Sequence, residues 1–245
     1  MYWQQLSTKE FADRVVGRAD TVLIPVGSVE AHGPHLPLGA DNLTPEAICQ
    51  RIERGHPDRI VVAPTIAYGH TWELAKWPGT ISLSSRLVAD YATEVGQAMV
   101  AWGMCQVIFV NGHGGNVGPL TEAMERIAES SARVLLINWW LDFSADILSV
   151  TTGQGHAGED ETSALLAVCP DLVDMTAAQQ NPNRMRWTGM KAQDILDRKF
   201  RHALTGNAKL ASQAKGEAIL NLVEQRILQL LDDLWADRLF DERRD

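Results

Sequence analysis

Residues 21–27 have the sequence Thr-Val-Leu-Ile-Pro-Val-Gly, a short apolar run that ends at a glycine. A run of this length without polar alternation is typical of a strand that is buried on both faces of a sheet. Similar runs follow at residues 106–111 and 133–138, and residues 59–63 form a shorter candidate. We therefore expect a sheet of buried strands at the centre of the fold.

Helical patterns separate these runs. Thr44 and Pro45 provide first-turn chemistry for a helix to about residue 54, and apolar residues at helical spacing predict another over residues 84–103. Further helices are expected over residues 118–129, 159–168 and 208–236. Alternating strands and helices indicate βαβ crossovers, so we predict an α/β fold with a mostly parallel sheet covered on both faces, as one domain over residues 1–245.

The last predicted helix carries a long apolar stripe, which packs on the same domain or forms a subunit contact.

Composition excludes several classes of function. The chain has 245 residues, 45% of them hydrophobic, and a net charge of −9, which disfavours a nucleic-acid partner. No apolar run approaches the ~20 residues that cross a bilayer, and residues 1–17 lack the apolar core of a signal peptide. The cysteines are odd in number and scattered, as in reduced cytoplasmic proteins. We expect a cytoplasmic enzyme without a membrane or nucleic-acid partner; the cysteines are Cys49, Cys105 and Cys169.

The stretch after the first strand concentrates acids and imidazoles. Residues 27–41 hold Glu30, His32, His35 and Asp41 in a loop stiffened by glycine and proline. Carboxylate oxygen and imidazole nitrogen together suit Zn²⁺, Mn²⁺ or Fe²⁺, and one aspartate can bridge two ions. Alone, the stretch is equally consistent with a hydrogen-bonded turn that contains ordinary histidines.

Two further clusters have the same character. Asn-Gly-His-Gly-Gly-Asn at 111–116 places His113 directly after a strand, and residues 156–163 place His156, Glu159 and Glu161 at the start of a helix. Ligands of parallel sheets collect beyond the carboxyl ends of the strands. We therefore expect these clusters to meet in one cleft with the first.

The three clusters together resemble the creatininase (creatinine amidohydrolase) family. The matching features are Glu-x-His-Gly-Pro-His-Leu-Pro-Leu-Gly-x-Asp at 30–41, the His113 motif at 111–116, and His-Ala-Gly-Glu-x-Glu-Thr-Ser at 156–163. The resemblance spans roughly residues 20–217. It implies a three-layer αβα sandwich, often a hexamer, that hydrolyses amides with two divalent ions.

The resemblance also implies roles for individual residues. Glu30 and His113 would bind one ion, His32 would bind the other, and Asp41 would bridge them. Enzymes that act on creatinine carry a glutamate ligand where this chain has Gly115. An acid must replace it, and we choose Glu159, with Glu161 as the alternative ligand or a catalytic residue that supports the ligands.

The predicted mechanism uses a water, activated by the two ions, that attacks the carbonyl of a small-molecule substrate. His156 would carry the proton to the leaving group, because an imidazole titrates near neutral pH. Amides, formamides and cyclic amides are the expected substrates, and creatinine is disfavoured by the glycine at the ligand position. The alternatives are a cyclic polyol ketone of the inosose type, a peptide bond in a cofactor precursor, or a non-catalytic module with a structural metal. The predicted substrate contacts are His70, Trp72, Glu73, Trp77, Gly114 and Gly115.

Overall fold

The computed structural model describes residues 1–240 and contains a parallel sheet of four strands in the order β2-β1-β3-β4. All four apolar runs predicted as strands keep their bounds to within one residue at either end. The strands are β1 (Thr21–Val26), β2 (Ile60–Val62), β3 (Gln106–Asn111) and β4 (Arg133–Asn138).

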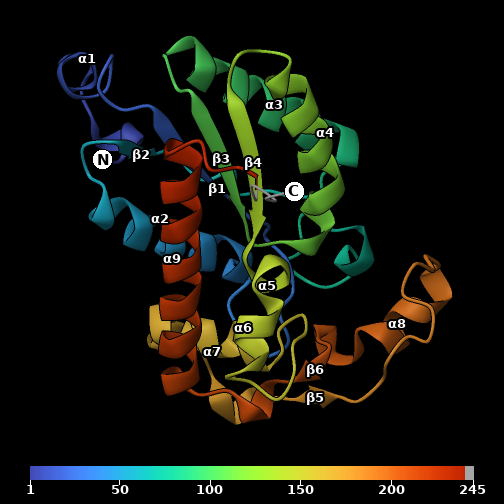
Figure 1. Cartoon of the computed structure of the whole chain (residues 1–245). Helices are drawn as coiled ribbons and strands as arrows, with labels where there is room; N and C mark the ends of the chain where they lie inside the picture. The colour runs from blue at the N-terminus through green and yellow to red at the C-terminus, as the bar shows by residue number, and fades with distance from the viewer. Residues whose placement is uncertain (241–245) are drawn as a thin grey trace, which may run out of the picture.

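Helices cover both faces of this sheet (Figure 1). Leu23 packs in a core cluster with residues of α2 (Ala40–Gly55), α7 (Glu159–Val168) and α9 (Gln213–Trp235). Its neighbours Val22 and Ile24 point to the other face, where they pack with residues of α3 (Ser85–Ala101) and α4 (Val117–Ala128). Successive strand side chains point to opposite faces, so one buried strand serves two cores. The result is the αβα sandwich that the sequence predicts.

Helix α9 begins later than predicted. Residues 208–210 form a separate 3₁₀ turn, and the Ser212 side chain accepts a hydrogen bond from Lys215 N as the N-cap. From there Ile219, Val223 and Ile227 are buried against the sheet and α2. The apolar stripe therefore packs on the chain itself.

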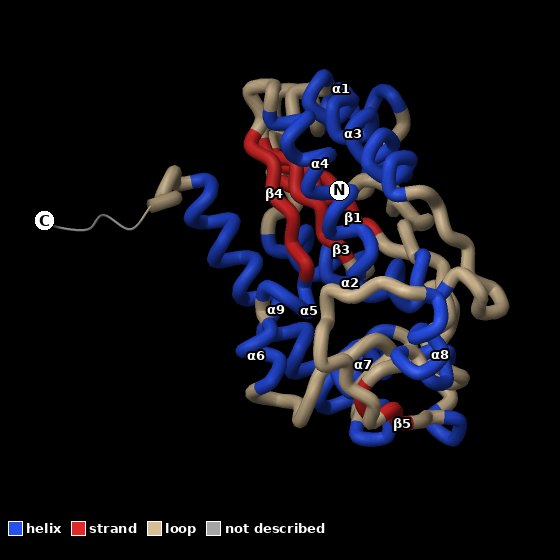
Figure 2. The backbone as a smooth tube through the Cα atoms, turned by 90° about the vertical axis from the view of Figure 1, so that its right-hand side faces the viewer, coloured by secondary structure: helices blue, strands red, loops and turns tan. Residues whose placement is uncertain are grey.

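The carboxyl ends of the strands lie level with one another. Val26 of β1 pairs with Asn111 of β3, which in turn pairs with Asn138 of β4. The chain that follows these ends forms a further layer beyond the sheet (Figures 1 and 2). It contains α5 (Trp139–Asp142), α6 (Ser144–Leu148), α8 (Leu196–Lys199) and the antiparallel pair β5 (Gln180–Asn181) and β6 (Gly206–Asn207).

The remaining helices in the part of the chain that the structure describes are helix α1 and several short 3₁₀ helices. Helix α1 (Thr8–Arg14), which the sequence patterns did not predict, starts with a capping box between Ser7 and Glu10. Within residues 1–240, no helix combines the length and apolar character that a membrane crossing requires. The 3₁₀ helices are Trp3–Gln5, Trp72–Leu74, Gly114–Asn116, Pro170–Leu172, Met175–Ala177, Gln193–Ile195, Arg201–Ala203 and Ala208–Leu210.

Candidate functional site

Three buried side chains from separate elements meet beyond the carboxyl ends of β1 and β3. Glu30 follows β1, Asp41 lies in the first turn of α2, and His113 follows β3. Nδ1 of His113 lies 3.0 Å from Asp41 Oδ2 and 3.2 Å from Glu30 Oε1. The fold thus joins residues that are far apart in sequence, because parallel strands end at one edge.

A second group adjoins the first through the same aspartate. Nε2 of His32 lies 2.9 Å from Asp41 Oδ1 and 3.7 Å from Glu161 Oε2 at the start of α7. Asp41 therefore presents one carboxylate oxygen to each histidine. These two groups, Glu30–Asp41–His113 and His32–Asp41–Glu161, are called the acid–imidazole cluster below.

Backbone carbonyls fix the orientation of both histidines. Nδ1 of His32 lies 3.1 Å from the Glu30 carbonyl oxygen, and Nε2 of His113 lies 3.0 Å from the His70 carbonyl oxygen. A carbonyl only accepts hydrogen bonds, so these nitrogens are the donors. The other ring nitrogen of each histidine is left facing the carboxylates. Thr71 Oγ1 also donates to Glu30 Oε2 and holds that carboxylate in place.

Burial and the neighbouring carboxylates act in opposite directions on the pKa values of the two histidines in the cluster. Burial alone would lower the pKa of His32, but the Asp41 carboxylate outweighs it and raises the pKa to about 10. Burial likewise opposes protonation of His113, yet Glu30 and Asp41 raise its pKa well above the ordinary value. Burial raises the pKa of Glu161 well above the ordinary value. These carboxylates and imidazoles need positive charge among them, which protons or cations can supply.

Two groups of side chains could each hold a metal ion. Donor atoms of Glu30, Asp41 and His113 all lie within 4.8 Å of one another, and so do those of Glu30, His32 and His156. Ligands bound at 2.0–2.2 Å around one ion are separated by roughly 3–3.5 Å, which is close to the spacings at Asp41. Over residues 1–240, His32 Nε2 and Asp41 Oδ2 are buried and form no hydrogen bond of ordinary geometry. Such atoms are satisfied when a cation lies against each of them.

The structure reverses our choice between the two glutamates of α7. Glu159 lies outside the acid–imidazole cluster: its Oε1 accepts from Lys215 Nζ at 2.6 Å, and its Oε2 accepts from Thr152 N and Oγ1. Glu161 instead faces His32. In a helix, residues two positions apart point about 200° away from each other, so only one of the pair can face inward.

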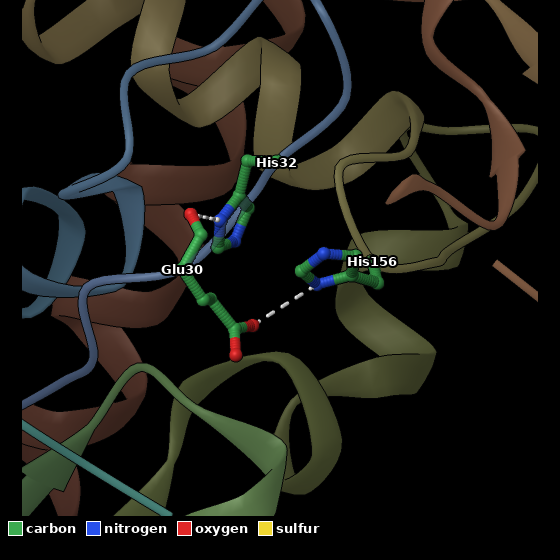
Figure 3. A group of neighbouring side chains, drawn as sticks. All are labelled: Glu30, His32 and His156. Atoms are coloured by element: carbon green, nitrogen blue, oxygen red, sulfur yellow. Dashed lines mark hydrogen bonds and ion pairs between the residues drawn. The ribbon is translucent and has the colours of Figure 1, made fainter. Parts of the chain in front are cut away.

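His156 lies at the open side of the cluster. Its Nε2 donates to the Ala31 carbonyl oxygen at 2.9 Å, and its Nδ1 lies 3.5 Å from Glu30 Oε1 (Figure 3). Burial, followed by the nearby His32, lowers the pKa of His156 to about 3, so the ring is neutral with an unprotonated Nδ1. His35 does not join the cluster, since its Nε2 lies 2.9 Å from Thr162 Oγ1. The lowered pKa of His156 differs from the near-neutral value that we expected for a proton carrier, so only the position of its Nδ1, which faces Glu30 at the cavity, supports that role.

A cavity of about 680 Å³ opens onto the cluster. Five of the six predicted substrate contacts line it, namely His70, Trp72, Glu73, Gly114 and Gly115. The prediction for Trp77 is wrong, because its ring packs against a buried cluster that contains Leu74 and Phe200. We did not predict Thr71, which lies between two predicted contacts, as a lining residue. The other lining residues that we did not predict lie in segments without a motif and include Leu141, Ser144, Gln154, Lys191 and Phe200.

The glycine at position 115 is dictated by the neighbouring backbone. A Cβ atom there would lie 1.9 Å from the His70 carbonyl oxygen and 2.6 Å from His113 Nε2. The same carbonyl oxygen accepts the hydrogen bond that orients His113. The path of the chain at His70 therefore excludes a side chain at position 115, and with it a glutamate ligand.

A parallel αβα sandwich with acids and imidazoles gathered at the carboxyl edge of its sheet defines an α/β protein with a candidate two-metal site. The family comparison is more specific: the model described as creatinine amidohydrolase matches residues 4–231, so the chain belongs to the creatininase family and is a hydrolase of that family. The predicted resemblance is thus confirmed.

Relatives within the family act on different substrates. The chain is 35% identical over 210 residues to the mycofactocin precursor peptide peptidase of Mycolicibacterium smegmatis, covering 81% of this chain and 78% of the relative. It is 27% identical over 250 residues to the creatinine amidohydrolase of Pseudomonas putida, covering 91% and 93%. A solved structure described as creatininase with Mn superposes with a TM-score of 0.83 at 26% identity, covering 95% of this chain and 97% of the other.

Proposed function

We propose that this protein is a two-metal hydrolase that cleaves a C–N bond next to a carbonyl group. Glu30, Asp41 and His113 would hold one divalent ion, and His32, Asp41 and Glu161 would hold the other. The observation that carries the proposal is the position of Asp41, whose two oxygens lie 2.9 Å from His32 Nε2 and 3.0 Å from His113 Nδ1. One carboxylate between two imidazoles is the geometry that a bridging ligand needs.

The donor set supports a catalytic site over a structural one. It consists of oxygen and nitrogen atoms without cysteine, which suits Zn²⁺, Mn²⁺ or Fe²⁺. Each ion would have three protein ligands and would keep open positions, whereas structural zinc sites close their shell, usually with cysteine. The cavity beside the cluster gives a substrate access to those positions.

The two ions would supply a water of lowered pKa and a Lewis acid for the substrate carbonyl. The chain supplies the proton transfer. Nε2 of His156 donates its hydrogen to the Ala31 carbonyl oxygen. Its Nδ1 would therefore accept the proton and pass it to the leaving nitrogen. Glu161 and Glu30 keep their places because Ala157 N and Thr71 Oγ1 donate to them.

The proposed substrate is a linear amide, including a peptide bond, and creatinine remains disfavoured. The 35% sequence identity to a peptide peptidase supports a linear amide as the substrate. The backbone excludes a side chain at Gly115, where creatinine enzymes carry a glutamate ligand, and this disfavours creatinine. Formamides, cyclic amides and inosose-type ketones are the competing substrates. A homo-oligomer, a hexamer by the family resemblance, remains a prediction.

The test starts from protein stripped of metal by a chelator. Mn²⁺, Zn²⁺ or Fe²⁺ is restored in turn, bound metal is counted, and short peptides, formamides, lactams and cyclic polyol ketones are screened for hydrolysis. The proposal expects two exchangeable ions per chain and metal-dependent cleavage of an amide. One tightly held ion with no hydrolysis of any class would favour the non-catalytic module instead.

A further inference from the structure

Residues 182–204 border the cavity and differ in charge from the rest of the chain. They contain six Lys and Arg side chains against two Asp side chains, a net charge of +4 in a chain whose total is −9. The segment reaches the cavity at Lys191 and Phe200. Its basic residues are Arg184, Arg186, Lys191, Arg198, Lys199 and Arg201.

Two lysines of this segment meet one carboxylate at the cavity wall. Both oxygens of Glu73 accept from Lys199 Nζ, at 2.7 and 2.8 Å, and Oε1 also accepts from Lys191 Nζ at 2.7 Å. Burial opposes ionisation of Glu73, but the two lysines hold its pKa below the ordinary value. One negative charge therefore faces two positive charges, and one positive charge is left over.

The two lysines are not equivalent. The Lys199 side chain is 19% exposed and lies over the ring of Phe200, with Nζ 4.9 Å from the ring centroid. The Lys191 side chain is 61% exposed and lines the cavity. Lys199 thus neutralises Glu73, while Lys191 leaves one uncompensated positive charge facing the cavity, where a ligand would meet it. Glu73, which we predicted as a substrate contact, lines the cavity and also positions these two lysines.

We propose that the substrate carries an anionic oxygen group, a carboxylate or a phosphate, which Lys191 binds at the cavity wall while the scissile carbonyl lies at the acid–imidazole cluster. This inference rests on the proposed function, since it assigns the substrate class of the same site. The remainder of the cavity wall includes the aromatic residues Trp72, Trp140 and Phe200, which suit the uncharged part of such a molecule.

The test uses alkyl hydroxamates, because a hydroxamate chelates metal ions at one end. The other end carries a carboxylate, a phosphonate or a primary amide, on alkyl chains of increasing length. Binding to the Mn²⁺-loaded protein is measured by calorimetry. At low ionic strength we expect an anionic probe to bind about fivefold more tightly than its amide counterpart, as for a partly exposed ion pair, and the preference to shrink in high salt.

Three variants assign the effect. Lys191→Gln should abolish the preference, Lys191→Arg should retain it, and Lys9→Gln, which removes a lysine paired with Asp13 on α1, should leave it unchanged. Preference for carboxylate over phosphonate, or the reverse, identifies the anion and supports the inference either way. Equal binding of anionic and amide probes, or a preference that survives Lys191→Gln, would overturn it. If the protein holds no metal and binds none of the probes, the two-metal proposal fails, and this inference fails with it.

Discussion

Glu161 and Glu159 lie two residues apart at the start of α7 but have different surroundings. Glu161 lies on the side that faces the acid–imidazole cluster, here the inner side, and Glu159 lies on the opposite, outer side. On the inner side, Glu161 faces His32 and belongs to the acid–imidazole cluster. On the outer side, Glu159 is bound by Lys215 of α9 and by Thr152. An acid-rich motif therefore shows which carboxylates are present, but the rotation of the helix about its axis decides which of them points into the cluster. Changes on the inner side should alter chemistry, and changes on the outer side should alter stability.

The largest effect is expected at the centre of the inner side. Asp41→Asn keeps the shape of the side chain but removes the charge between His32 and His113. We expect kcat to fall by about 10⁴-fold or more, because a neutral amide is a poor bridging ligand for two cations. Hydrolysis of the best amide from the substrate screen measures the loss, and thermal unfolding checks that the variant is folded. A folded variant with more than a tenth of the activity would contradict the role.

His156→Gln should reduce kcat by about 10²- to 10⁴-fold, because the proton at the leaving nitrogen would have no carrier. Metal content should stay at the wild-type value, since His156 is not among the proposed ligands. A substrate with an activated leaving group that needs no proton should recover most of the rate. Equal losses with activated and ordinary substrates would show that His156 acts in another way.

The exclusion of a side chain at Gly115 should appear as lost stability. Gly115→Ala places a methyl group against the His70 carbonyl oxygen, and we expect unfolding free energy to fall by about 3 kcal/mol, at the upper end of overpacking costs. Gly118→Ala is the matched control, because no atom outside its own helix lies within 4 Å of the added Cβ. The control should be neutral or more stable by up to about 1 kcal/mol. Similar stability of the two variants in urea would refute the clash.

The outer side gives the smallest expected change. Glu159→Gln removes the partner of Lys215 and weakens two hydrogen bonds from Thr152, so we expect a loss of about 1–2 kcal/mol. Activity per folded molecule should be unchanged. Glu217→Gln on α9 serves as the exposed control and should change stability by less than about 0.5 kcal/mol. A large loss of activity in Glu159→Gln would place that side chain in the chemistry after all.

Much of this arrangement is predictable from the sequence. Apolar runs located the four strands. The rule that ligands gather beyond parallel strand ends placed Glu30, Asp41 and His113 together, as the distances from His113 Nδ1 to the two carboxylates show. The charges and motifs alone did not indicate which glutamate of α7 faces inward. That depends on the rotation of the helix about its axis, which the packing of α7 against α9 and α2 fixes.

The remaining gaps have other physical causes. Residues 182–204 show no periodic pattern, so their place beside the cavity follows only from tertiary contacts such as those of Lys191 and Lys199 with Glu73. Trp77 was expected to contact the substrate because it lies in the same segment as His70, Trp72 and Glu73, yet its side chain packs with Leu74 and Phe200. A large aromatic residue near a site serves packing or binding equally well, and sequence alone does not separate the two.

Whether Glu161 holds the second ion is decided by the metal content of Glu161→Gln, measured beside Glu159→Gln after both are stripped and reloaded with Mn²⁺. We expect Glu161→Gln to lose about one ion per chain and Glu159→Gln to keep the two proposed for the wild type. Full metal content in Glu161→Gln, or the loss of an ion from Glu159→Gln alone, would show that Glu161 is not a metal ligand.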